Sequence, residues 1–157
     1  MSENFDSIEI PESGHALLEK SAFGMLSTIR AKDCMISTNP VGFVWDGKYI
    51  RISTLKSRLK YQNIKCDSRI SFCVISTKNI MNYIEIRGLA TLDEDPDCTF
   101  SRRQFMEGTG GIEPPEDMDP PGSERVIITI HPKQISSPTL YGGRFDKSND
   151  WLDSSKK

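Results

Sequence analysis

The clearest pattern along the chain is an alternation of apolar and polar residues with a period of two, which is typical of strands that bury one face. Between residues 48 and 54, for example, Ile50 and Ile52 alternate with polar neighbours. The preceding pair Asp46-Gly47 lies between two apolar runs and indicates a hairpin turn. The pattern predicts six strands, at residues 25–30, 35–45, 48–54, 69–76, 83–92 and 125–131, with Pro132 ending the last of them.

Three short helices are predicted between these strands. Ser13 is placed to cap a helix over 13–23 that stops at Gly24, and shorter helices are expected at 57–66 and 99–108. Residues 108–124 combine four prolines with glycines and acidic residues, so we expect a long loop there. Residues 1–11 and 143–157 are polar, and we expect flexible tails at both ends.

These elements favour a mainly β (α+β) fold. No predicted helix is a long amphipathic crossover, which a doubly wound sheet would need, so we expect a six-stranded antiparallel barrel with short flanking helices. A length of 157 residues suits a single domain over 1–157. The strand at 69–76 is apolar on both faces, which one barrel interior cannot cover, so we expect a homodimer.

Composition narrows the class of protein. Hydrophobic residues make up 36% and charged residues 27%, no apolar run exceeds strand length, and the N-terminus lacks a leader pattern. We therefore expect a cytoplasmic protein with no membrane role. The four cysteines have no Cys-x-x-Cys spacing, so free thiols and no metal site are expected.

Positive charge is concentrated in one part of this acidic chain. Residues 48–65 hold six lysines and arginines and no acidic residue, although the formal net charge of the chain is −2. The run Thr54-Leu55-Lys56-Ser57-Arg58-Leu59-Lys60 places hydroxyls, cations and a helix N-terminus in one strand-to-helix turn, which favours phosphate. A solvated basic helix is the alternative. A nucleic-acid site with Tyr49 and Tyr61 as stacking residues is disfavoured, because the patch covers a single turn.

Several short segments, taken in order, resemble the pyridoxamine 5′-phosphate oxidase-like split β-barrels, and within them the branch that uses coenzyme F420. The resemblance extends from about Ser13 to Ile135. The segments are Phe23-Gly24-Met25-Leu26-Ser27-Thr28, Asn39-Pro40-Val41-Gly42-Phe43-Val44-Trp45-Asp46-Gly47, Ile52-Ser53-Thr54 with Lys56, Arg58, Lys60 and Asn63, and Tyr83-Ile84-Glu85-Ile86-Arg87-Gly88.

The resemblance implies a set of cofactor-binding residues. It implies a phosphate site at Thr54, Lys56, Ser57, Arg58 and Lys60 with Asn63 close behind, a wall beside the flavin at Ser37, Asn39, Pro40 and Val41, and a flavin-facing residue at Tyr83. Pro40 also has a structural interpretation, as the proline of an edge strand or bulge. Tyr83 likewise suits simple packing on a sheet.

The resemblance also implies a function. It favours a cytoplasmic oxidoreductase that moves hydride between F420 and a small organic substrate, in a homodimer with the cofactor between subunits. FMN is the alternative cofactor, and a protein that only carries a flavin, a deazaflavin or haem is the alternative function. The cofactor ring supplies the chemistry, so no catalytic side chain is named, and His15 and His131 are interpreted as structural. The C-terminal residues 149–157 lack the Arg-Leu-x-Pro-like ending of true pyridoxamine phosphate oxidases, which argues against pyridoxine phosphate as substrate.

Overall fold

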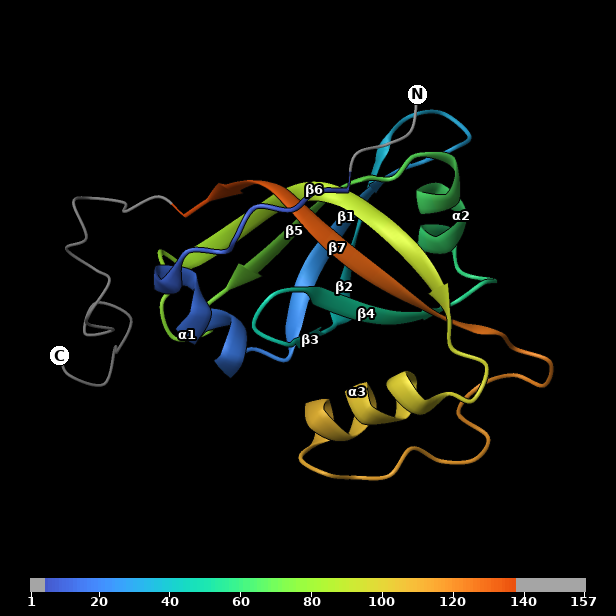
Figure 1. The fold of residues 1–157 in the computed structure, drawn as a ribbon. Helices are drawn as coiled ribbons and strands as arrows, with labels where there is room; N and C mark the ends of the chain where they lie inside the picture. The colour runs from blue at the N-terminus through green and yellow to red at the C-terminus, as the bar shows by residue number, and fades with distance from the viewer. Residues whose placement is uncertain (1–4, 138–157) are drawn as a thin grey trace, which may run out of the picture.

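The computed structural model describes residues 5–137; residues 1–4 and the expected tail at 143–157 lie outside the described part of the chain. Within that part, one antiparallel sheet of seven strands has the order β2-β1-β5-β6-β7-β4-β3, with three short helices around it (Figure 1). This confirms the mainly β fold and adds one strand to the six predicted. The elements are α1 (Glu12–Lys20), β1 (Phe23–Ile29), β2 (Ile36–Gly42), β3 (Val44–Trp45), β4 (Ile50–Leu55), α2 (Leu59–Cys66), β5 (Arg69–Ile75), β6 (Tyr83–Glu94), α3 (Thr99–Thr109) and β7 (Arg125–Ser136).

The extra strand arises at Phe43, where the predicted strand over 35–45 divides. β2 pairs with β1 at one edge of the sheet, whereas β3 pairs with β4 at the other. The Phe43 amide turns aside to donate to the Ala22 carbonyl at 3.2 Å. The apolar pattern continues through this point, so it could not reveal the change of partner. Because adjacent residues join opposite edges, the sheet must curl on itself.

The curled sheet remains open along one line. β2 and β4 approach each other, but in the described sheet no strand pairing joins them. The result is a split barrel, with a core made from the inner faces of the strands and from α1. Its fully buried large side chains include Leu18, Leu26, Ile52, Phe72, Ile86 and Ile128.

The helices cover the ends and the open side of this barrel. α1 packs against β5 and β6, α2 packs against β1 and β6, and α3 contacts β2, β4 and β7 (Figure 1). α1 ends at Lys20 and not at Phe23 as predicted, because Phe23 lies opposite Gly42 as the first residue of β1. None of the described helices is long and apolar enough to cross a membrane.

β7 continues past Pro132 to Ser136, so the prediction that Pro132 ends the strand is wrong. A bulge between Arg87 and Gly88 shifts the register here, and Gly88 lies opposite Pro132. A β-carbon at Gly88 would lie 2.1 Å from the carbonyl oxygen of His131, so only glycine fits. The bulge allows β7 to continue through Pro132, although proline has no amide hydrogen to donate to β6.

β5 differs from the expectation of a strand buried on both faces. Ile70, Phe72 and Val74 are buried in the core, but Cys73 is only half-buried and Ile75 is 46% exposed on the outer face. The outer face of β5 is mixed, because Arg69 and Ser71 alternate onto it together with Cys73 and Ile75.

Candidate functional site

A cleft of about 340 Å³ lies where the barrel is split. We call it the β2–β4 cleft. It is bounded by the end of β2, the end of β4, the start of α2 and the loop before β7. Its lining residues are Pro40, Val41, Gly42, Ser53, Thr54, Leu55, Arg58, Lys60, Met118, Asp119 and Arg125.

The cleft gathers five of the residues expected from the sequence, which are Pro40, Val41, Thr54, Arg58 and Lys60. The first three come from β2 and β4, two strands that are not paired with each other. Thr54 is buried and ends the inner face of β4, while the two cations begin α2. The open edge of the sheet thus meets the basic strand-to-helix turn.

Arg58 and Lys60 are cations without an acidic partner among the described residues. Lys60 is half-buried, and this burial, followed by the nearby charge of Arg58, lowers the pKa of its amine. Arg58 stands at the N-terminus of α2, which no side chain caps. Two uncompensated positive charges beside uncapped helical amides favour an anion in the cleft.

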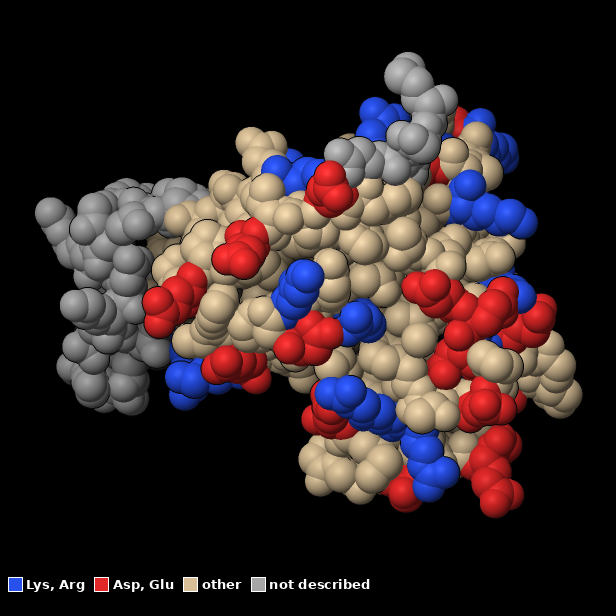
Figure 2. Space-filling view, in the orientation of Figure 1, with Lys and Arg blue, Asp and Glu red and all other residues tan. Residues whose placement is uncertain are grey.

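Lys56, two residues earlier, is already neutralised. Its amine lies 2.9 Å from Glu94 Oε1 and 3.0 Å from Glu124 Oε1, and hydrogen bonds to these carboxylates raise its pKa. Figure 2 shows acidic side chains gathered in this region, over the adjoining ends of β6 and β7 and the 110–124 loop. The expected phosphate role of Lys56 therefore has a local competitor, and neighbouring Ser57 is exposed to solvent outside the cleft lining.

Arg125 is a cleft residue that the sequence reasoning missed. Its guanidinium donates to Asp119 through two nitrogens at 2.6 and 2.7 Å, and to Ser53 Oγ at 3.1 Å. Only 15% of the Arg125 side chain is exposed. Its position directly after the proline- and acid-rich loop could have drawn attention to Arg125 as a site residue. Because Arg125 also begins the alternating pattern of β7, it was interpreted as an ordinary strand residue.

β2 carries the residues that were predicted to form a wall beside the flavin, and its side chains alternate between the two faces of the strand. Ser37, Asn39 and Val41 lie opposite Thr28, Leu26 and Gly24, so they point to the inner face. That row ends in the cleft at Val41. Pro40 lies on the outer face of β2, which is an edge strand. Proline, which has no amide hydrogen, is tolerated in edge strands because they pair with a neighbour on one side only.

Like Ser37, Asn39, Lys56 and Ser57, the last two expected residues, Asn63 and Tyr83, lie outside the cleft lining. Asn63 is buried, donates to Thr28 Oγ1 at 3.0 Å and accepts from the Ala31 amide at 3.4 Å, so it ties α2 to the turn after β1. Tyr83 lies on the outer face of β6, opposite Ile75.

The histidines are engaged in packing and hydrogen bonds. His15 Nε2 lies 2.8 Å from the Ile10 carbonyl oxygen, and its ring is 4.8 Å from that of Trp45. His131 lies between the rings of Phe5 and Tyr49, and burial is the main cause that lowers its pKa. Among residues 5–137, no group of three His, Cys, Asp or Glu side chains is placed to hold a metal ion.

The fold class is therefore an antiparallel split barrel, with two cations that lack an acidic partner in the described chain at its open edge. Comparison with protein families is more specific: a family described as pyridoxamine 5′-phosphate oxidase matches residues 10–137, and the chain belongs to this family. No curated protein matches the chain in sequence.

Solved structures agree with the family. A structure named F420 reductase is 34% identical, with 81% of this chain and 98% of that chain covered and a TM-score of 0.70. General stress protein 26 from Bacillus anthracis strain Sterne is 22% identical, with 79% and 89% covered and a TM-score of 0.59. A heme binding protein from Mycobacterium smegmatis is 13% identical, with 86% and 57% covered and a TM-score of 0.62; at this identity it shows the fold alone.

Proposed function

We propose that this chain is an oxidoreductase that binds coenzyme F420 in the β2–β4 cleft and exchanges hydride between F420 and a small organic substrate. The observation that carries the proposal is the pair Arg58 and Lys60, which line the cleft without an acidic partner in the described chain. Cations held in this way gain stability from an anionic ligand, and phosphate is the anion that suits a strand-to-helix turn.

The preference for F420 over FMN rests on two further points. The anionic groups of F420 include a phosphodiester and an acidic glutamyl tail, which suit a cleft that holds two cations without an acidic partner in the described chain, Arg58 and Lys60. The 34% identity to a structure named F420 reductase supports the same choice. FMN, with a single terminal phosphate, remains the alternative that the same turn could hold.

The chain itself supplies binding, orientation and exclusion of water. Arg58 and Lys60 would hold the phosphate, and the inner row of β2, Ser37, Asn39 and Val41, would lie along the ring or its side chain. Val41 and Thr54 are buried at the cleft and would shield the cofactor from water there. When bound, the cofactor ring supplies the hydride chemistry.

We propose that the functional unit is a homodimer formed through the outer face of the sheet. Phe23, Met25 and Ile36 are exposed on this face by 64%, 37% and 73%. Tyr83 lies on the same outer face, away from the cleft of its own chain. In such a dimer, Tyr83 of one subunit could contact the cofactor held in the cleft of the other.

A turnover assay tests the proposed reaction. Reduced F420 would be mixed with the purified chain and a panel of small organic acceptors, and the return of oxidised F420 fluorescence would be followed, with reduced FMN in parallel. We expect chain-dependent oxidation of reduced F420 by at least one acceptor, with loss of rate in Arg58→Ala. Tight F420 binding without turnover by any acceptor would favour the carrier function instead.

A further inference from the structure

One side chain of α3, Gln104, connects the helix to both strands that border the split in the barrel. Its carboxamide oxygen accepts a hydrogen bond from the Ser53 amide of β4 at 2.8 Å. Its carboxamide nitrogen lies 3.4 Å from the place that a β-carbon would take at Gly42 of β2. This half-buried side chain therefore bonds to one strand of the split and packs beside the other.

Gln104 supplies a partner that the sheet does not. Because the Ser53 amide bonds to Gln104, it is directed away from β7 and towards the open edge of β4. Among the described residues, β3 pairs with β4 at Ile50 and Arg51 and no further, so no strand lies beside Ser53 at that edge. A side-chain oxygen thus takes the place of a strand carbonyl and satisfies the amide.

The two residues that Gln104 approaches belong to the cleft. Gly42 lies on its β2 wall and Ser53 on its β4 wall, although Gln104 itself is outside the lining. Ser53 is also held from a second direction, because its hydroxyl accepts from Arg125 at 3.1 Å and Asp119 in turn binds Arg125. The carboxamide therefore links the two walls at residues that face the ligand space.

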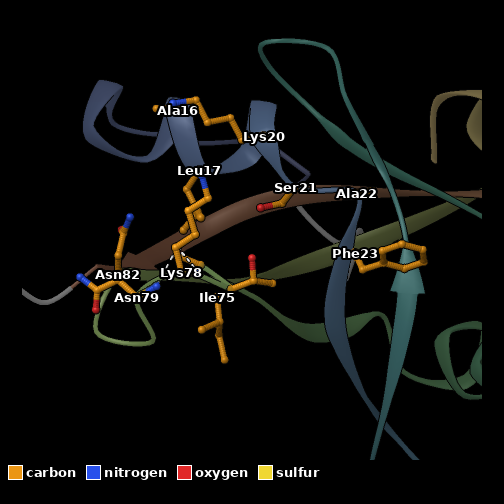
Figure 3. Close-up of a pocket in the computed structure, with 12 residues that line it drawn as sticks. Ala16, Leu17, Lys20, Ser21, Ala22, Phe23, Ile75, Lys78, Asn79 and Asn82 are labelled. Carbon is orange, nitrogen blue, oxygen red and sulfur yellow. Dashed lines mark hydrogen bonds between the residues drawn. The ribbon is translucent and has the colours of Figure 1, made fainter. Parts of the chain in front are cut away.

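The end of β2 is supported from the β1 side as well. Gly42 lies opposite Phe23, and the next residue, Phe43, donates its amide to the Ala22 carbonyl at 3.2 Å. Figure 3 shows Ala22 and Phe23 at the start of β1, beside a hollow under α1. Since no strand pairing joins β2 to β4 in the described sheet, contacts of this kind, and not a ladder, determine the width of the cleft.

We propose that Gln104 is a positioning residue, which holds the β2 wall and the β4 wall of the cleft at the spacing that the cofactor needs. The inference rests on the proposed function, because it takes the cleft to be the cofactor site. A ligand that meets only Arg58 and Lys60, such as inorganic phosphate, does not depend on this spacing. A cofactor that also extends along β2 uses both walls and does depend on it.

Hydrogen exchange of the Ser53 amide tests the contact on the full chain without a cofactor. Gln104→Met keeps the length of the side chain but removes the acceptor, whereas Gln104→Glu keeps an oxygen that can accept. We expect Ser53 to exchange about tenfold faster in Gln104→Met and near the native rate in Gln104→Glu. Arg103→Gln is the control, since Arg103 is exposed and pairs with Glu107 within α3. A native exchange rate in Gln104→Met would overturn the proposal.

Equilibrium titrations test the positioning role. Gln104→Met should bind F420 about three- to tenfold more weakly than the native chain and inorganic phosphate equally well, whereas Arg103→Gln should bind both ligands like the native chain. A lower urea midpoint with native affinity for F420 would show a merely structural role and overturn the proposal, as would an equal loss for both ligands. If the native chain binds neither F420 nor FMN, the proposed function fails, and the exchange rates of Ser53 still show separately whether Gln104 holds β4.

Discussion

At the scale of single residues, the cations in and beside the cleft form two groups: some are paired with a carboxylate, and others have no acidic partner in the described chain. Lys56 is bound by Glu94 and Glu124, and Arg125 is bound by Asp119, whereas Arg58 and Lys60 have no such partner in the described chain. The sequence shows all of these charges but not their partners; Glu94 and Glu124, for example, are distant in the chain from Lys56.

Lys60 gives a prediction about pH. Burial and Arg58 lower the pKa of its amine, so the amine loses its proton at a lower pH than an ordinary lysine and contributes less to binding above that pH. We expect the affinity for F420 to fall as the pH rises from about 7 to about 10. In Lys60→Arg the guanidinium stays charged over this range, and the fall should be much smaller. If the dissociation constants of the native chain and of Lys60→Arg change with pH in the same way, Lys60 does not contribute its charge to F420 binding.

At the scale of elements, the bulge between β6 and β7 gives a prediction about stability. Gly88→Ala should lower the free energy of unfolding by about 2–4 kcal/mol, because the new β-carbon meets the His131 carbonyl oxygen. Gly108→Ala in α3 is the matched control, since nothing lies within 4 Å of its β-carbon position, and it should be neutral or stabilising. Urea unfolding of both variants measures the difference, and similar midpoints would refute the close contact at Gly88.

The loop between α3 and β7 gives a second prediction at this scale. Asp119 already occupies Arg125, so it competes with an incoming phosphate for that guanidinium. Asp119→Asn should tighten F420 binding by about three- to tenfold and lower the stability of the free protein. Asp117→Asn, an exposed change in the same loop, serves as the control. Weaker F420 binding in Asp119→Asn would show that the carboxylate supports the site instead.

The same elements show how far the sequence could lead. Local periodicity predicted the strands and placed the basic turn at the start of α2, because both depend on neighbours in the chain. It could not show that Phe43 joins opposite edges of the sheet, since hydrogen-bond partners far apart in sequence decide this. It also misjudged Pro132, because Gly88, which makes room for it, lies on another strand.

At the scale of the whole molecule, the exposed outer face of the sheet predicts a dimer. Native protein should sediment as a dimer, and adding F420 should tighten it, because binding and assembly are linked when two subunits share a site. Ile36→Lys places a charge on that face and should shift the protein towards monomer. Ile112→Lys is the control, since Ile112 is 63% exposed in the loop after α3. A native monomer that binds F420 with full affinity at every dilution would rule out a shared site.

The most direct test of the central claim is an equilibrium titration of the native chain and three variants with F420 and with FMN. We expect Arg58→Ala and Lys60→Ala each to weaken F420 binding by about 1–3 kcal/mol, because each loses a charge-assisted contact with phosphate. Lys65→Ala, an exposed change in the last turn of the same helix, should bind like the native chain, and F420 should bind more tightly than FMN. Equal affinities in the native chain, Arg58→Ala and Lys60→Ala would contradict the assignment of the β2–β4 cleft as the cofactor site.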